Sequence, residues 1–259
     1  MRGLCAGAAA LIFAAAPATA FAHESFFAQA GPLAAGRPIR LILGSGAFPL
    51  VETAIRPDRV ARVQARASDT LLAPTLSGGP SALHLSLDWP GTRPPHQNGV
   101  VVAVDLLPRN IEVGPEEIDH YMDEVGAPAD IVTVARAVVA RDGVMREIET
   151  RRLKLMACIA TCDGLAPARP FGSTLEFVAA DEAWQLLENG QPRVGQAVFV
   201  TTAMQGRQKL TTDRLGRVLL PAGLTGPILL SAAVLTPPAG PNDRFTSEWA
   251  TLTLDASVR

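Results

Sequence analysis

The sequence predicts a mainly β protein, built of two β-sandwich domains of immunoglobulin-like type with a short helical insertion in the first. Alternation of apolar and polar residues, which is typical of a half-buried strand, recurs along the chain. Clusters of glycine, proline and asparagine separate these stretches and indicate turns. Many short strands between such turns favour sandwiches of antiparallel sheets. The clearest alternating stretches are Ile39–Leu43, Leu83–Trp89, Val198–Thr201 and Trp249–Leu254.

The first 22 residues have the layout of a cleavable export signal. Arg2 precedes an apolar run from Leu4 to Ala16, and the small-residue ending Ala20-Phe21-Ala22 follows. The run is too short for a membrane span and no second run follows it. We therefore expect a periplasmic protein without a transmembrane segment, cleaved after either Ala22 or Ala20.

Either cleavage places His23 where it can bind a metal ion. Cleavage after Ala22 makes it the first residue, whose α-amine and imidazole can chelate one ion. Cleavage after Ala20 makes it the third residue. The amine, two deprotonated amides and the imidazole then form the square-planar nitrogen set that suits copper(II) or nickel(II). Phe26 and Phe27 are expected to pin the first strand into the sandwich and so hold this histidine at a fixed place.

A terminal histidine needs one or two further ligands. Glu24 is adjacent in the chain, and His96 lies in a turn that could fold toward the terminus. His120 lies on a helix face opposite Ile118 and Met122. Imidazole and carboxylate together suit nickel, cobalt, copper and zinc alike, so these ligand types do not choose the metal. The predicted metal ligands are His23, Glu24, His96 and His120.

The first domain is expected to span residues 23–165, with a helical insertion at about 115–141. A proline and two acids open this insertion, where a missing N–H costs little and the helix dipole favours negative charge. Apolar residues at helical spacing predict one helix over 118–125 and a second over 128–141. From Glu147 onward the chain is expected to return to strand.

A Pro/Gly-rich stretch at 164–170 indicates a linker, followed by a second β domain over residues 170–259. Cys158 and Cys162 lie just before the linker and remain after removal of the leader. A local disulfide between them is expected in an oxidising periplasm. A metal clip of two thiolates is the alternative.

Charge and motif content exclude several classes of function. Without the leader the chain carries 22 Lys and Arg against 25 Asp and Glu. No basic stripe is present, so a nucleic-acid partner is not expected. The sequence also contains no nucleophile elbow, phosphate loop, paired-histidine zinc helix or dinucleotide fingerprint. We therefore expect a protein that is not an enzyme.

Six segments of the chain carry a resemblance to a known family. They are His23–Phe27, Val113–Met122, Arg146–Lys154, Pro170–Val178, Thr212–Val218 and Ser247–Leu254. In this order they resemble a family of periplasmic proteins tied to nickel and cobalt uptake. That family is a domain of unknown function related to the extracytoplasmic parts of energy-coupling-factor nickel transporters. Its pattern includes a histidine in the penultimate strand, where this chain has Ser231–Leu235.

The resemblance implies a nickel- or cobalt-binding accessory protein whose partner is a membrane metal transporter. Two other functions fit the same sequence. One is a structural or protein-interaction module of the envelope that binds no metal. The other is a copper-binding protein that uses an N-terminal histidine.

Overall fold

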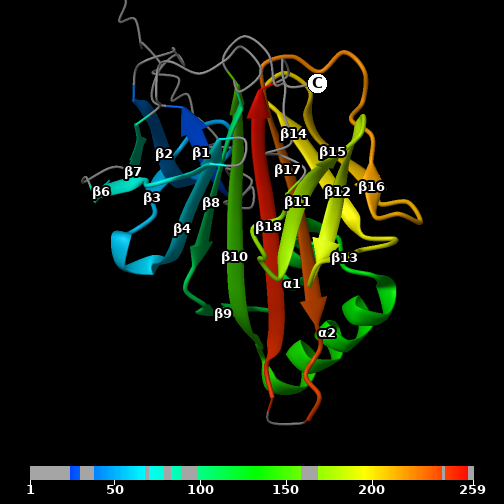
Figure 1. Ribbon diagram of the computed structural model, residues 1–259. Coiled ribbons are helices and arrows are strands. Elements are labelled where there is room, and N and C mark those ends of the chain that lie inside the picture. Colours follow the sequence, from blue (N-terminus) through cyan, green and yellow to red (C-terminus); the bar gives the residue numbers. More distant parts are fainter. Residues whose placement is uncertain are drawn as a thin grey trace, which may run out of the picture.

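The computed structural model describes residues 24–29, 38–67, 70–78, 83–88, 99–158, 169–240 and 243–255 (Figure 1). Within these residues the chain is mainly β, with two α-helices and one short 3₁₀ helix. The predicted mainly β class is therefore confirmed. No helix in the described part of the chain combines the length and the apolar character that crossing a membrane requires.

A nine-stranded sheet forms the centre of the molecule, in the order β15-β14-β17-β18-β10-β8-β4-β5, with β9 also pairing β10. Its strands are β4 (Val60–Ala67), β5 (Thr70–Leu72), β8 (Gly99–Leu106), β9 (Arg109–Val113), β10 (Met145–Cys158), β14 (Ala197–Thr202), β15 (Gly206–Thr211), β17 (Pro227–Thr236) and β18 (Phe245–Asp255). The pairing of β10 with β18 is parallel, from Glu147 against Phe245 to Met156 against Leu254. The other pairings within this sheet are antiparallel.

Two smaller sheets complete the β structure. The five-stranded sheet contains β1 (Glu24–Gln29), β2 (Ile39–Gly46), β3 (Thr53–Ala54), β6 (Thr75–Gly78) and β7 (Leu83–Leu87). The four-stranded sheet contains β11 (Leu175–Ala180), β12 (Ala183–Glu188), β13 (Gln191–Pro192) and β16 (Arg217–Val218). The 3₁₀ helix η1 (Pro57–Arg59) precedes β4.

The two smaller sheets pack on opposite faces of the central sheet. Successive side chains of a strand point to opposite faces. On β8, Val100, Val102 and Val104 belong to the apolar core beneath the five-stranded sheet. Val101 and Ala103 belong instead to the core beneath the four-stranded sheet. The central sheet is therefore buried on both faces, which explains why all eight residues of β8 are buried.

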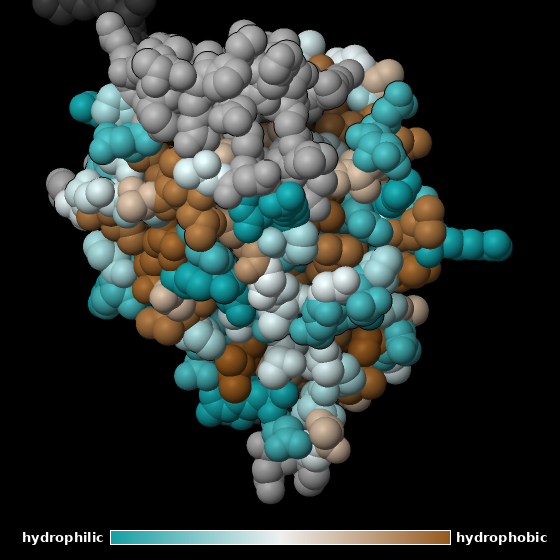
Figure 2. All heavy atoms as spheres, viewed as in Figure 1, coloured by the Kyte–Doolittle hydropathy of each residue, from teal (hydrophilic) through white to brown (hydrophobic). Residues whose placement is uncertain are grey.

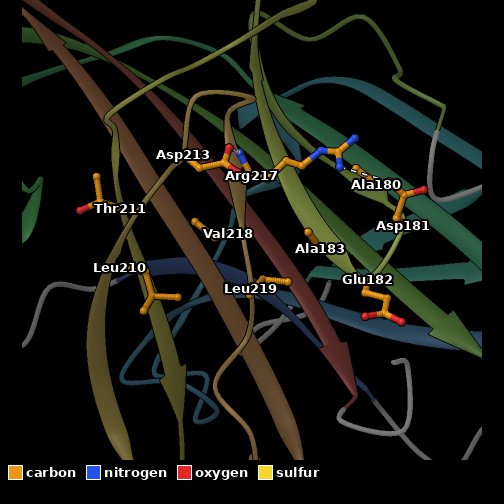
Figure 3. Close-up of a pocket in the computed structure, with 10 residues that line it drawn as sticks. All are labelled: Ala180, Asp181, Glu182, Ala183, Leu210, Thr211, Asp213, Arg217, Val218 and Leu219. Carbon is orange, nitrogen blue, oxygen red and sulfur yellow. Dashed lines mark hydrogen bonds and ion pairs between the residues drawn. The ribbon is translucent and has the colours of Figure 1, made fainter.

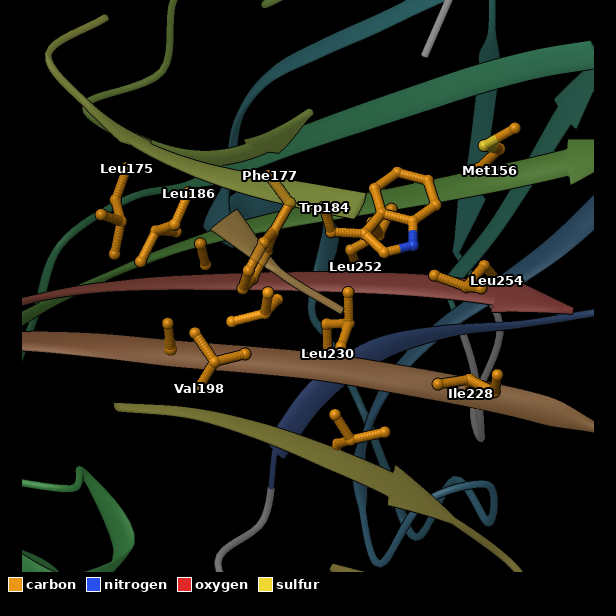
Figure 4. Packing of buried hydrophobic residues seen from close by; sticks show 14 of the residues in the cluster. Met156, Leu175, Phe177, Trp184, Leu186, Val198, Ile228, Leu230, Leu252 and Leu254 are labelled. Atoms are coloured by element: carbon orange, nitrogen blue, oxygen red, sulfur yellow. The ribbon is translucent and has the colours of Figure 1, made fainter. Parts of the chain in front are cut away.

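The core under the four-stranded sheet shows how the layers interdigitate. Phe177 and Trp184 of the four-stranded sheet lie against Leu230 and Leu252 of the central sheet (Figure 4). Phe177 is 1% exposed, so truncating it would open a cavity in a close-packed interior. Trp184 is buried in the same core.

Helices α1 (Ile118–Glu124) and α2 (Ala129–Asp142) agree with the predicted helices over 118–125 and 128–141. They cover the end of the face that also carries the five-stranded sheet, with Met122 and Val139 in one core with Trp249. Thr251, two residues along β18 from this tryptophan, points the same way and donates to the Ser25 carbonyl of β1. The helices and β1 therefore lie on the same face of the central sheet.

The predicted return to strand after the helices is also confirmed. Leu153, Leu155 and Ala157 of β10 share one buried face, as their spacing predicts. The central sheet, however, takes strands from both sides of the predicted linker, so it continues across the expected boundary between domains. Most of the linker lies outside the described residues, and the two-domain division stays a prediction.

Candidate functional site

A group of buried and half-buried polar side chains lies between β1 and the helices, on the same face of the central sheet. Glu147 is completely buried and Glu149 is 1% exposed, which is unusual for carboxylates. Hydrogen bonds connect most members to one another across four strands and α1. The group, called the polar cluster below, comprises Glu24, Ser25, Tyr121, Glu147, Glu149, Arg151, Ser231, Ser247 and Thr251.

The first two residues of β1 are fixed by this cluster. Ser231, on β17, donates a hydrogen bond of 2.5 Å from its Oγ to Glu24 Oε1. Ser25 Oγ lies 2.8 Å from Ser45 Oγ and accepts a bond of 3.3 Å from Arg151 Nη1. Thr251 Oγ1 donates to the Ser25 carbonyl at 2.9 Å. Strands β2, β10, β17 and β18 therefore all hold the start of β1.

Arg151 is the cation at the centre of the cluster. It donates two parallel bonds to the Glu149 carboxylate, of 2.7 and 2.9 Å, and its guanidinium lies 4.8 Å from the ring centre of Trp249. Arg109 makes a second pair of bonds to the same carboxylate. Burial alone would raise the pKa of Glu149, but the charges and hydrogen bonds of the two arginines lower it to about 2. The carboxylate is therefore ionised and fully paired.

A second carboxylate links the cluster to helix α1. The Tyr121 hydroxyl lies 2.8 and 2.9 Å from the two oxygens of Glu147, and Ser247 also bonds this carboxylate. Trp249 Nε1 donates to the Ser247 hydroxyl. Burial raises the pKa of Glu147, and burial beside this carboxylate raises the pKa of Tyr121 well above its usual value. These bonds hold α1 against the central sheet.

The C-terminal half of α1 carries a further carboxylate, Glu124, on which the charge of Glu24 acts. Burial raises the pKa of Glu124 to about 7, while the charges of Arg151, Arg207 and His120 oppose the rise. Glu24 adds to it. Burial likewise raises the pKa of Glu24, and its bond to Ser231 opposes this. The charges of Glu24 and His120 therefore both act on Glu124, although Glu24 belongs to β1 and the other two residues belong to α1.

The structure describes two of the four predicted metal ligands. Glu24 is buried, with one oxygen bonded to Ser231, and His120 is exposed on α1. His23 and His96 lie outside the described residues. Among the described residues no group of three or more His, Cys, Asp or Glu side chains could hold a metal ion. A site built on His23 is therefore left as a prediction.

The predicted cysteine pair also falls at the limit of the described chain. Cys158 is the last residue of β10, where its backbone pairs with Gly99. Its side chain and the whole of Cys162 lie outside the described residues. Both interpretations, the local disulfide and the two-thiolate clip, stay predictions.

The sequence interpretation did not single out the inner members of the cluster. Glu147, Glu149 and Arg151 occupy every second position of β10 and lead directly into Leu153 and Leu155 on the same face. Charged residues in a strand are usually solvated, which hides such a pattern. The sequence signal for the cluster is that one face of β10 continues without a break from charged residues to buried leucines.

The surface also contains a cavity of about 640 Å³ between the four-stranded sheet and β15 (Figure 3). Its polar groups serve the local structure. Asp213 accepts the N–H groups of Leu215 and Arg217 in the turn between β15 and β16, and these bonds lower its pKa. Arg217 pairs with Asp181 across the cavity wall. These polar side chains of the cavity wall therefore have partners within the wall itself.

On the face shown in Figure 2, apolar and hydrophilic residues are interspersed. Comparison of the chain with protein-family models and with curated proteins finds no match.

Proposed function

We propose that this chain is an exported, periplasmic protein that binds a transition-metal ion, nickel or cobalt, and serves its uptake. The ion is held first by the amine and imidazole of His23, and a membrane metal transporter receives it. The observation that carries the proposal is the fixing of the next two residues, Glu24 and Ser25, by bonds to the central sheet. A terminus is normally mobile unless it is tied down. Here the chain is tied down directly after the chelating residue.

Glu24, His96 and His120 are the further ligands in this proposal. Glu24 is adjacent to His23 in the chain, and His120 is exposed on α1. The described side chains do not by themselves form a group that could hold an ion, so the proposed site depends on His23. Imidazole, amine and carboxylate together form a mixed nitrogen and oxygen set that suits these ions.

The finer form of the fold belongs to the same proposal. The packing of a smaller sheet on each face of the central sheet supports two β-sandwich units of immunoglobulin-like type. In that arrangement residues 23–165 and 170–259 each contribute one outer sheet and part of the shared one. Limited proteolysis within 159–168 tests it, because two sandwiches joined by a linker would be cut there first.

The decisive experiment compares two defined chains, one beginning at His23 and one at Phe21. Isothermal titration of each with nickel, cobalt and copper measures affinity and stoichiometry. We expect one ion per chain, and the loss of tight binding in a His23→Ala variant. A His84→Ala variant is the matched control, since this histidine lies half-buried on β7 and is turned away from the leucines of the core. Equal affinity in the wild type and His23→Ala would remove the terminal chelate.

The order of metal preference separates nickel and cobalt uptake from copper binding. A chain that begins at Phe21 should bind copper(II) with the visible absorption of a square-planar nitrogen set. Mass spectrometry of the exported protein identifies which of the two chains exists. Tight binding of copper alone would favour the copper-binding alternative.

A structural module of the envelope is the second candidate. The observation that favours it is the internal pairing of the polar cluster, because Glu149 is satisfied by two arginines and Glu147 by Tyr121 and Ser247. Such a network stabilises one structure without any ion. Absence of metal binding, together with a stable complex isolated from the envelope, would support this function.

A further inference from the structure

We propose that a small apolar cavity at one edge of the central sheet binds a neutral molecule of the phenol class, a single ring that carries one hydroxyl group. The cavity has a volume of about 170 Å³. Among the described residues that line it, Thr253 alone has a polar side chain, and the other eight are apolar. The site does not depend on the metal chelate proposed above and is made of a different group of residues.

The cavity lies near the ends of two central strands. Because β10 and β18 run parallel, Leu155 and Thr253 pair with each other close to the last residues of these strands. Phe27 of β1 and Phe48 of the turn after β2 contribute aromatic walls. The ring of Phe48 meets the ring of Phe26 edge to face, with 5.1 Å between the ring centres. The walls are therefore held by regular strands and by a packed aromatic pair.

The volume and the chemistry of the walls define the body of the ligand. An engineered apolar cavity of about 150 Å³ binds one benzene molecule, so this cavity has room for one ring with a small substituent. None of the described residues that line it is charged. An ion would lose its hydration there without gaining a partner of opposite charge. The cavity therefore favours a neutral ring over a charged one.

The hydroxyl group of Thr253 defines the polar end of the ligand. Thr253 is 6% exposed, and its Oγ1 is buried without a hydrogen-bond partner among the described residues. Buried hydroxyl groups are normally bonded, because leaving one unpaired costs free energy. A water molecule in the cavity would need about two to four polar partners, and the other described wall residues offer only apolar side chains. Rotation of the threonine between staggered χ1 rotamers turns its hydroxyl toward a ligand hydroxyl on an apolar ring.

Thr201 of β14 provides a matched control for Thr253. Its Oγ1 is also buried without a hydrogen-bond partner among the described residues. Leu229 of β17 pairs with both threonines, so the two side chains lie on the same face of the sheet. Thr201 does not belong to the described lining of the cavity. Thr201→Val and Thr253→Val each replace an unpaired hydroxyl by a methyl group of similar shape, so both variants should fold at least as stably as the wild type.

The test is isothermal titration of the wild type and the two valine variants with phenol, toluene and benzoate. Phenol and toluene have the same number of non-hydrogen atoms and differ in the hydroxyl group, and benzoate adds a charge. We expect one phenol molecule per chain and no binding of benzoate. The ratio of phenol affinity to toluene affinity should fall about three- to tenfold in Thr253→Val and stay within about twofold in Thr201→Val.

Nuclear magnetic resonance of the methionine methyl groups locates the bound molecule. Met156 lines the cavity, whereas Met204 lies in the turn between β14 and β15 and is 81% exposed. Phenol should shift the Met156 signal and leave the Met204 signal in place. An unshifted Met156, no saturable binding of phenol, or benzoate binding as tightly as phenol would overturn the inference. An affinity ratio that is unchanged in Thr253→Val, or that falls equally in Thr201→Val, would overturn it as well.

Discussion

The buried ion pair between Lys154 and Glu176 ties the four-stranded sheet to the central sheet, and its removal tests the fold most directly. Lys154 Nζ donates to Glu176 Oε2 and to the Phe177 carbonyl, each at 2.6 Å. Glu176 also accepts the backbone N–H groups of Phe171 and Gly172, at 3.0 and 2.9 Å. The two partners are 6% and 4% exposed. The carboxylate therefore has three donors, while the ammonium has two acceptors and the nearby ring of Phe171.

This asymmetry predicts which variant costs more. Breaking a buried pair by removing one partner destabilises a protein by about 3–5 kcal/mol. Lys154→Met leaves Glu176 with two backbone donors, so we expect about 3 kcal/mol. In Glu176→Gln the amide replaces one acceptor by a donor, so either the ammonium or a backbone N–H loses its partner. We expect about 4–5 kcal/mol for this variant.

The pH dependence separates the two variants further. Burial lowers the pKa of Lys154 from 10.5, and the charge of Glu176 opposes this. Without the carboxylate the pKa should fall further. Between the folded and unfolded pKa values the unfolded chain binds more protons, so stability rises with pH. Glu176→Gln should therefore regain stability between about pH 7 and about pH 10, whereas Lys154→Met should not.

Urea unfolding followed by tryptophan fluorescence at both pH values measures these differences. Losses below about 1 kcal/mol in both variants would show that the pair is not buried in solution. A flat pH profile in Glu176→Gln would refute the argument that the lysine is left as an unpaired buried cation.

Three further predictions concern the other face of the sheet. The pKa of Glu149 is about 2 in the folded protein against 4.5 in the unfolded chain, so its stabilisation is complete above pH 4.5 and is lost as the pH falls toward 2. Urea unfolding should show a loss of about 3 kcal/mol over that interval, and Glu149→Gln should lack it. The pKa of Glu124 is about 7, so the folded state loses stability as the pH rises from 4.5 to 7. Thermal unfolding should find Glu124→Gln more stable than the wild type at about pH 8, by about 1–2 kcal/mol, with no gain at about pH 4. Gly126→Ala should lower the free energy of unfolding at least twice as much as Gly143→Ala does, as measured by urea unfolding. Both glycines have positive φ. A Cβ at Gly126 would lie 2.6 Å from the Ala197 Cβ, whereas Gly143 faces open space.

Several of the strands and both helices could be predicted because their signals are local. Val198 and Val200 belong to one core and Phe199 lies on the opposite face beneath Arg207, as alternation requires. Helix α2 differs from the predicted 128–141 by one residue at each end. Periodicity reports which side of an element is buried, and burial is what determines these elements.

The partners of the strands could not be predicted in the same way. Alternation shows the face of a strand but not its neighbour, so nothing in Met145–Cys158 indicates a parallel partner at Phe245–Asp255. That single pairing joins strands from both halves into one sheet. The predicted division into two domains depends on a Pro/Gly-rich stretch, which is an equally local signal and does not show which strands pair across it.

The candidate site was predicted only where chemistry and sequence position coincide. Glu24 was chosen as a ligand for its adjacency to His23, and the structure shows that its first oxygen already has a partner in Ser231. The place of Arg151 at the centre of the polar cluster depends on its contacts with Ser25 and Trp249, which are distant in sequence. Such a role follows from tertiary structure and has no local pattern.

The polar cluster determines the register of β1, which apolar packing alone does not determine. Phe26 and Phe27 are both fully buried and hold β1 strongly, but apolar contacts are not directional. A strand shifted by two residues would present the same faces, so packing alone does not determine its register. The bond from Ser231 to the Glu24 carboxylate and the bonds of Arg151 and Ser45 to the Ser25 hydroxyl need these two side chains and are satisfied in one register only. A shift would leave buried polar groups unpaired, at about 1–3 kcal/mol each. The register, and with it the place where His23 joins the folded chain, is therefore determined by the cluster.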